Sequence, residues 1–171
     1  MTQQESRQDE RLGTVSQVPE GVRLQFRRSW PDPIEDVWAA LTEPDRMVRW
    51  IGAYEGERRI GATGTFTMTH EEQPVGEPMT IVECSPPHRL VVEWATEEGW
   101  RVQLDLTREG DQTVLLFTQV FAAGTEVVDY VLGWHWYLDK FDAEVGGREQ
   151  PTGNWDAFYA EIGPAYGPPP A

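Results

Sequence analysis

The sequence of 171 residues has little cysteine, little positive charge and no long apolar run. Its single cysteine, Cys84, has no partner for an internal disulfide, and there is no cysteine cluster of the kind that holds structural zinc. Lys and Arg number 14 against 29 Asp and Glu, a net charge of −15. Nucleic acids and anionic membrane surfaces are bound by clustered cations, which this composition does not supply. We therefore expect neither of these partners.

Two further absences concern location. No stretch approaches the roughly 18 consecutive apolar residues of a membrane-spanning helix. Residues 1–20 contain no apolar segment of the secretory type. These observations predict an acidic cytoplasmic protein that is not inserted into a membrane.

Tryptophan, by contrast, is abundant, with eight residues in a polar chain of mean hydropathy −0.52. The length predicts one domain. Residues 1–20 are polar and are predicted to be a disordered tail, and residues 164–171, rich in Pro and Gly, a second one. The folded domain is expected over residues 21–163.

Hydrophobic periodicity predicts the secondary structure. Alternating apolar residues predict strands, and a spacing of three and four predicts helices. Strands are expected over 22–30, 64–70, 77–84, 89–94, 100–106 and 113–121, two short helices over 34–41 and 45–50, a long helix over about 125–145 and a further helical stretch over 154–163. Short turns between consecutive strands favour an antiparallel meander.

The long helix carries one continuous apolar stripe, with intervals of 4, 3, 4, 3 and 4 residues from Val127 to Val145. Such a helix covers one face of a curved antiparallel sheet. The fold predicted is therefore α+β: a sheet of about six or seven strands wrapped over a long C-terminal helix, with two short helices after the first strand. The space between helix and sheet is a candidate ligand pocket.

Four segments resemble a known family. They are PIEDVWAALT at 33–42, followed by Pro44 and Arg49-Trp50; PPHRL at 86–90; GWHWYLD at 133–139; and Trp155-Asp156. Together they resemble the START-like (SRPBCC) superfamily, and within it the bacterial single-domain members of the family named after the activator of Hsp90 ATPase. The resemblance covers about residues 20–162 and implies the helix-grip fold.

The resemblance implies a scaffold whose members bind different ligands, and it does not specify one activity. The eukaryotic co-chaperones of this family carry an additional N-terminal domain that grips Hsp90. Because a tail of 20 residues is too short for such a domain, Hsp90 activation is not expected here.

The candidate ligand-binding residues are those that periodicity and the resemblance place around the space between helix and sheet. They are Trp38, Trp50, Phe66, Met68, His70, Trp94, Trp100, Val131, Trp134, His135 and Leu138. The aromatic residues among them form either a filled core or the wall of a cavity for a hydrophobic or planar ligand. Trp136 points away from the apolar stripe, so we expect it to meet Trp155, Phe158 or the second subunit of a homodimer.

His135 is the leading catalytic candidate, and His70, Glu83 and Glu93 are further candidates. His135 lies beside the apolar stripe, one turn before Asp139. It is either a polar group at the pocket rim, acting as general acid or base, or a half-buried histidine bonded to Asp139.

No cofactor and no metal are expected. The sequence has no nucleophile elbow, no phosphate-binding loop and no dinucleotide fingerprint. His70, Glu71 and Glu72 cannot converge on one ion from a single strand, because adjacent side chains point to opposite faces.

Three functions stay open at this stage. The first is binding of a small hydrophobic or aromatic ligand in the cavity. The second is a co-chaperone-like or regulatory module that binds another protein through its acidic surface. The third is an enzyme in the manner of START-like cyclases, with His135 as acid or base.

Overall fold

The computed structural model of the chain describes residues 11–96, 99–151 and 153–166. Eight strands form a single sheet: β1 (Thr14–Val18), β2 (Gly21–Trp30), β3 (Gly52–Glu55), β4 (Thr63–Met68), β5 (Gly76–Ser85), β6 (Arg89–Trp94), β7 (Trp100–Glu109) and β8 (Gln112–Phe121). The helices are α2 (Ile34–Thr42), α3 (Pro44–Met47), α4 (Val128–Val145), α5 (Trp155–Ile162) and the 3-10 turn η1 (Gly163–Tyr166).

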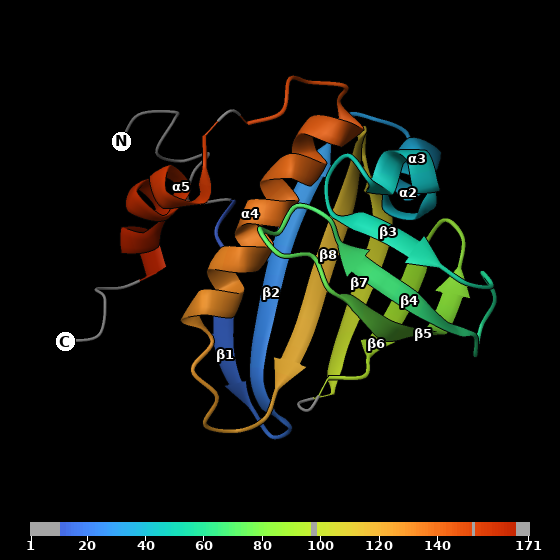
Figure 1. Ribbon diagram of the computed structural model, residues 1–171. Helices are drawn as coiled ribbons and strands as arrows, with labels where there is room; N and C mark the ends of the chain where they lie inside the picture. Colours follow the sequence, from blue (N-terminus) through green and yellow to red (C-terminus); the bar gives the residue numbers. More distant parts are fainter. Residues whose placement is uncertain (1–10, 97–98, 152, 167–171) are drawn as a thin grey trace.

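The sheet is antiparallel throughout, in the order β1-β2-β8-β7-β6-β5-β4-β3. Consecutive strands pair from β1 to β2 and from β3 to β8, and the pairing of β2 with β8 joins these two parts of the sheet. Helix α4 runs along one face of the sheet, α2 and α3 lie near β3, and α5 packs beside α4 on its outer side (Figure 1). This is the helix-grip α+β fold that the sequence predicts, with eight strands instead of six or seven.

Two strands are additional to the six expected ranges: the short β3, and β1, which lies within residues 1–20, where a disordered tail is expected. Residues 14–18 pair with β2 over the register from Thr14↔Gln25 to Val18↔Gly21. The side chains of β1 are mostly exposed, so the strand is held by main-chain hydrogen bonds at the sheet edge and shows no apolar alternation. Likewise Gly163–Tyr166 forms η1 inside the predicted second tail, while residues 1–10 and 167–171 lie outside the described residues.

The core lies between α4 and the sheet. The predicted stripe is buried along its length, through Val131, Trp134, Leu138, Phe141 and Val145. The helix has 18 residues, which corresponds to about 27 Å, and it begins at Val128, three residues later than expected. Over the residues that the structure describes, no helix has the length and apolar character needed to cross a membrane.

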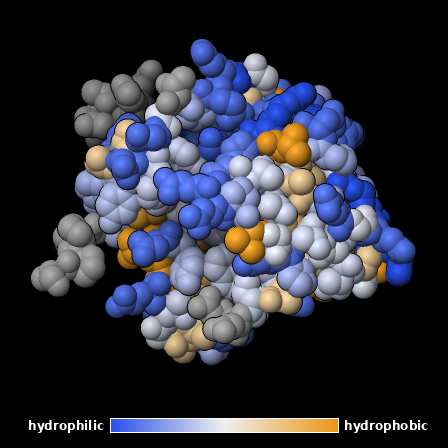
Figure 2. Space-filling view, viewed as in Figure 1, coloured by the Kyte–Doolittle hydropathy of each residue, from blue (hydrophilic) through white to orange (hydrophobic). Residues whose placement is uncertain are grey.

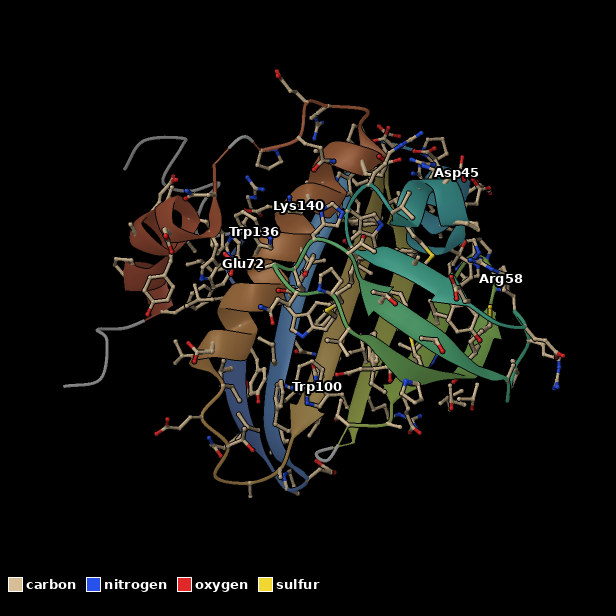
Figure 3. The ribbon with its side chains drawn as sticks, viewed as in Figure 1. Asp45, Arg58, Glu72, Trp100, Trp136 and Lys140 are labelled. Carbon is tan, nitrogen blue, oxygen red and sulfur yellow. The ribbon has the colours of Figure 1, made fainter. Side chains whose placement is uncertain are left out.

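The predicted contact of Trp136 with the C-terminal segment is confirmed. Its ring centroid lies 5.7 Å from that of Trp155 and 5.2 Å from that of Phe158, both nearly perpendicular. The ammonium of Lys140 lies 4.8 Å from the Trp136 ring, and Figure 3 shows both side chains on α4. Hydrophilic side chains dominate the face seen in Figure 2, with hydrophobic atoms only in small separate spots.

Candidate functional site

A small void of about 70 Å³ lies between α4, the sheet and the α2–α3 segment. All fourteen residues that line it are apolar: Leu41, Met47, Trp50, Ile51, Phe66, Met79, Leu90, Val92, Trp94, Val102, Leu104, Phe117, Trp134 and Leu138. The void is therefore an apolar site at the place where the sequence predicts a pocket.

Strand alternation and helix spacing bring these residues together. Val102 and Leu104 on β7 alternate with polar neighbours, and on β6 Val92 and Trp94 lie on one face with the exposed Glu93 between them. Trp134 is one turn before Leu138 on α4, so both project toward the sheet.

The aromatic wall has a defined geometry. The Trp134 ring lies 4.8 Å from Phe117 and 6.3 Å from Trp94, measured between centroids. Trp94 meets Phe66 edge to face at 5.5 Å. Contacts of this kind favour well-ordered rings, so most of the predicted cavity is occupied by side chains.

The remaining volume is small for a ligand site. Pockets for drug-sized molecules measure roughly 300–1,000 Å³, and an engineered apolar cavity of about 150 Å³ accommodates benzene. Two wall residues, Met47 and Met79, have flexible side chains that adapt to a neighbour's shape. The wall can therefore change shape at the methionines more readily than at its indoles.

Two indoles in the wall donate hydrogen bonds. Trp50 Nε1 donates to the carbonyl of Ala40 at 2.8 Å, and Trp134 Nε1 donates to Oε1 of Gln119 at 2.8 Å. Gln119 lies on the inward face of β8 and was missed by the sequence analysis. Its signal is a polar residue at an inward position of an otherwise apolar strand, between Phe117 and Phe121.

Five of the predicted ligand residues line the void: Trp50, Phe66, Trp94, Trp134 and Leu138. The other six do not. Val131 is buried in the core, and Trp38 and Met68 are partly buried against it. Trp100 packs against Tyr130 at 5.2 Å near the end of the sheet (Figure 3). His70 is only partly buried and its Nε2 donates to the carbonyl of Val48 at 2.9 Å.

His135 lies outside the void, on the side of α4 that faces β2 and the C-terminal segment. It is 1% exposed, with Nδ1 2.7 Å from the hydroxyl of Tyr166 and Nε2 3.5 Å from Oδ2 of Asp139. Phe26 contacts its ring edge-on. His135 therefore has the contacts of a hydrogen-bonded core histidine.

Asp139 belongs to a buried ionic cluster. Arg28 lies 3.1 Å from Asp139 and 2.6 Å from Asp142, and Arg11 lies 2.7 Å and 2.9 Å from the same two carboxylates. Burial alone raises the pKa of Asp139, but the hydrogen bond and charge of His135 and the charges of the two arginines outweigh it and lower this pKa. For Asp142 burial outweighs the arginines, and the pKa is raised.

An open cleft of about 1130 Å³ lies beside this cluster. Its lining includes Arg11, Arg27 and Arg28, each of which pairs with a carboxylate. These three cations are therefore already neutralised, and the cleft has the character of a solvated ionic surface.

The other titratable candidates are paired or unsuited to catalysis. Glu83 lies 3.2 Å from Arg89, and Glu93 lies 2.9 Å from Arg101 on the neighbouring strand. Burial raises the pKa of Cys84, which disfavours its thiolate. Within the ranges described, no three His, Cys, Asp or Glu side chains gather as metal ligands would.

Solved structures of known proteins share this fold. CalU16 from Micromonospora echinospora is 26% identical over 91% of this chain and 94% of its own, with a TM-score of 0.69. The protein encoded by gene BPP1335 from Bordetella parapertussis is 26% identical over 90% and 88%, with a TM-score of 0.70. DynU16, a putative protein in the dynemicin biosynthetic locus, is 21% identical over 74% and 48%, with a TM-score of 0.64.

Comparison with curated proteins finds no match. Residues 32–146 match the family described as "Activator of Hsp90 ATPase homolog 1-like protein". This match extends from the segment before α2 to the end of α4, and thus includes every element that lines the void. The chain belongs to the activator of Hsp90 ATPase homolog 1-like family, within the START-like superfamily.

Proposed function

We propose that the protein binds a small hydrophobic or aromatic ligand between α4 and the sheet. The observation that supports this most directly is the apolar void among Trp50, Trp94 and Trp134. An apolar ligand there gains from removal of its surface from water and from contact with three indole faces.

At about 70 Å³ the void holds only a few non-hydrogen atoms, so binding requires the wall to widen. Met47 is the last residue of α3, a helix of only four residues, and Ile51 lies in the turn between α3 and β3. Met47 and Met79 can change rotamer at small cost because their side chains are unbranched. We infer that the ligand enters on this side, with α4 and β7 as the fixed wall.

A matched pair of substitutions tests whether the ligand binds in the void. Val102 lines the void, whereas Val120 on β8 is 40% exposed. Val102→Phe fills the void, and Val120→Phe adds the same atoms at the surface. The probes are naphthalene, biphenyl, flavone and dodecanol. Binding of each probe is measured by tryptophan fluorescence and by thermal denaturation.

We expect at least one probe to quench fluorescence and raise the melting temperature of the natural protein and of Val120→Phe, because a ligand that binds only the folded state stabilises it. Val102→Phe should lose both responses. Equal responses in the two variants would place binding elsewhere, and no response to any probe in the natural protein would count against the proposal.

The enzyme alternative has weaker support. His135, its acid or base, is enclosed by Phe26 and Tyr166 and does not line the void. A reacting group held in the void would therefore not meet this imidazole, which faces β2 and the C-terminal segment.

A further inference from the structure

The side chain of Gln119 is the one amide on the buried face of β8. It is 1% exposed, and its inward neighbours two residues away are Phe117 and Phe121. In the sheet register it lies opposite Val102 on β7 and Leu24 on β2. A neutral polar group is thus buried in aromatic and aliphatic surroundings.

The orientation of this amide follows from its partner. The indole Nε1–H of Trp134 can only donate, so the atom that it meets at 2.8 Å must be the amide oxygen of Gln119. The amide nitrogen, Nε2, then points away from the Trp134 indole, and both of its N–H groups are donors. This nitrogen is buried and has no hydrogen-bond partner among the described residues.

A buried donor without an acceptor is unusual. The great majority of buried side-chain polar atoms in proteins are paired, because an unpaired group keeps the full cost of having lost its water. Replacement of Gln119 by an apolar residue would remove that cost, yet the chain places an amide here. A donor of this kind fits a position that is satisfied by a bound molecule.

Gln119 is adjacent to the void without lining it. Three lining residues surround it: Trp134, whose indole N–H donates to the Gln119 oxygen; Val102, which lies opposite Gln119 on β7; and Phe117, which precedes it on the same face of β8. A ligand that widens the void past Trp134 or Val102 would therefore reach the Gln119 amide before any other buried side-chain donor of β8.

We infer that Gln119 Nε2 donates a hydrogen bond to an acceptor oxygen of the ligand, and that the ligand is a neutral, largely apolar molecule carrying a carbonyl or ether oxygen at one end. This inference rests on the proposed ligand-binding function and specifies its substrate class. Trp134 acts as the positioning residue, because its indole N–H binds the amide oxygen and so leaves the amide nitrogen available to the ligand.

The wall also argues against a charged ligand. None of the residues that line the void is ionisable, and Gln119, which contacts Trp134 and lies opposite Val102, is neutral. Burial of a carboxylate without a cation or several donors is strongly unfavourable. Ketones, lactones and aryl ethers fit this chemistry, whereas fatty acids and plain hydrocarbons do not.

Shape-matched probes isolate the hydrogen bond. 2-Acetylnaphthalene and 2-isopropenylnaphthalene have nearly the same size and shape, but the first has a carbonyl oxygen where the second has a methylene group. 2-Naphthoate adds a charge to the same ring. The dissociation constants of all three are measured by titration calorimetry, with each corrected for its transfer from water to octane.

For the natural protein we expect the corrected affinity for the ketone to exceed that for the alkene by about fivefold to tenfold, as one neutral hydrogen bond allows. The naphthoate should bind more weakly than either. In Gln119→Met, which retains the length of the side chain, the ketone and the alkene should bind equally. Gln103→Met, the same change at an outward position of β7, should keep the preference.

The outcomes separate the two proposals. If the alkene and ketone both bind but Gln119→Met keeps the preference, the cavity is a binding site and the role of Gln119 is wrong. If neither binds the natural protein, both proposals are wrong. Binding of the alkene to Gln119→Met also reports that this variant is folded.

A second measurement is made on the natural protein and uses Gln119→Met only to assign a signal. The side-chain amide of Gln119 gives a ¹⁵N–¹H signal that is identified by its absence in Gln119→Met. The ketone should shift one of the two Nε2 protons downfield, and the alkene should not. Identical shifts with the two probes would overturn the inference.

Discussion

The phenol oxygen of Tyr166 lies 2.7 Å from Nδ1 of His135 and so joins η1 to the middle of α4. The same oxygen accepts a hydrogen bond from the backbone N–H of Gly13 at 2.8 Å. One hydroxyl thereby connects the segment before β1, the long helix and the C-terminal turn. Burial raises the pKa of Tyr166 to about 12, so this hydroxyl stays protonated at neutral pH.

Tyr166→Phe should therefore destabilise the protein. The change leaves His135 and the Gly13 N–H without their shared partner, and an unsatisfied buried group costs about 1–3 kcal/mol. Urea unfolding followed by circular dichroism measures the loss. Tyr159→Phe, at a residue that is 41% exposed on α5, is the control and should change stability by less than about 0.5 kcal/mol. Equal losses in the two variants would contradict the role of this hydroxyl.

The ionic cluster predicts a specific dependence of stability on pH. The pKa of Asp139 is lowered in the folded protein, so its carboxylate contributes stability that is present above the unfolded pKa of about 3.9. That contribution is lost as the pH falls from this value through the folded pKa. Asp139→Asn should therefore be less stable than the natural protein at pH 7 and show a flatter loss of stability below about pH 4.

Asp142 gives a control of opposite sign. Its folded pKa is raised, so its protonation on acidification favours the folded state. Asp142→Asn lacks this gain and should lose stability more steeply than the natural protein as the pH falls toward about 4. Urea midpoints measured from pH 7 to pH 3 compare the three proteins. Parallel curves for all three would exclude both assignments.

The sequence predicts the helix-over-sheet arrangement well because a helix or strand with one buried face has regularly spaced apolar residues. The stripe from Val131 to Val145 on α4 and the alternation on β6 and β7 both arise from one buried face. Strand β1 escapes this reasoning, since its side chains are mostly exposed and only its backbone pairs. An edge strand without a buried face has no period to detect.

The site was predictable in part for the same reason. Trp94, Trp134 and Leu138 line the void because periodicity directs them inward. The direction of His135 was not predictable, because it depends on Tyr166, a residue 31 positions away whose contact follows from the path of α5 and η1. Gln119 was not predicted because it is neutral and belongs to no motif, so its only signal is a polar residue at an inward position of β8.

Glu144, near the end of α4, should be important for stability. Its Oε1 accepts hydrogen bonds from Arg46 at 2.9 Å and from Arg49 at 3.0 Å, and its side chain is buried. Glu144→Gln keeps the shape and removes the charge, and hydrogen bonds to charged groups contribute about 1.5–3 kcal/mol. We expect a loss in this range by urea unfolding.

Asp36 provides the matched comparison because it pairs with the same arginine, Arg46, at 2.8 Å but is 40% exposed in its side chain. Asp36→Asn should cost at most about 1 kcal/mol, since solvent screens an exposed pair. A larger loss for Asp36→Asn than for Glu144→Gln would mean that burial does not decide the strength of these pairs.

Leu138→Ala tests whether the void can grow into a binding cavity without any natural ligand. Leu138 lines the void, so the volume freed by truncation joins the existing 70 Å³, whereas Leu132, also on α4, is fully buried and does not line it. Both alanine variants should lose roughly 2–5 kcal/mol of stability. Benzene should then raise the melting temperature of Leu138→Ala clearly more than that of Leu132→Ala, because a preformed void and a new one are merged only at position 138. Equal benzene effects would mean that the wall collapses around Leu138 on truncation, and that the residues between α4 and β7 are less rigid than their aromatic contacts indicate.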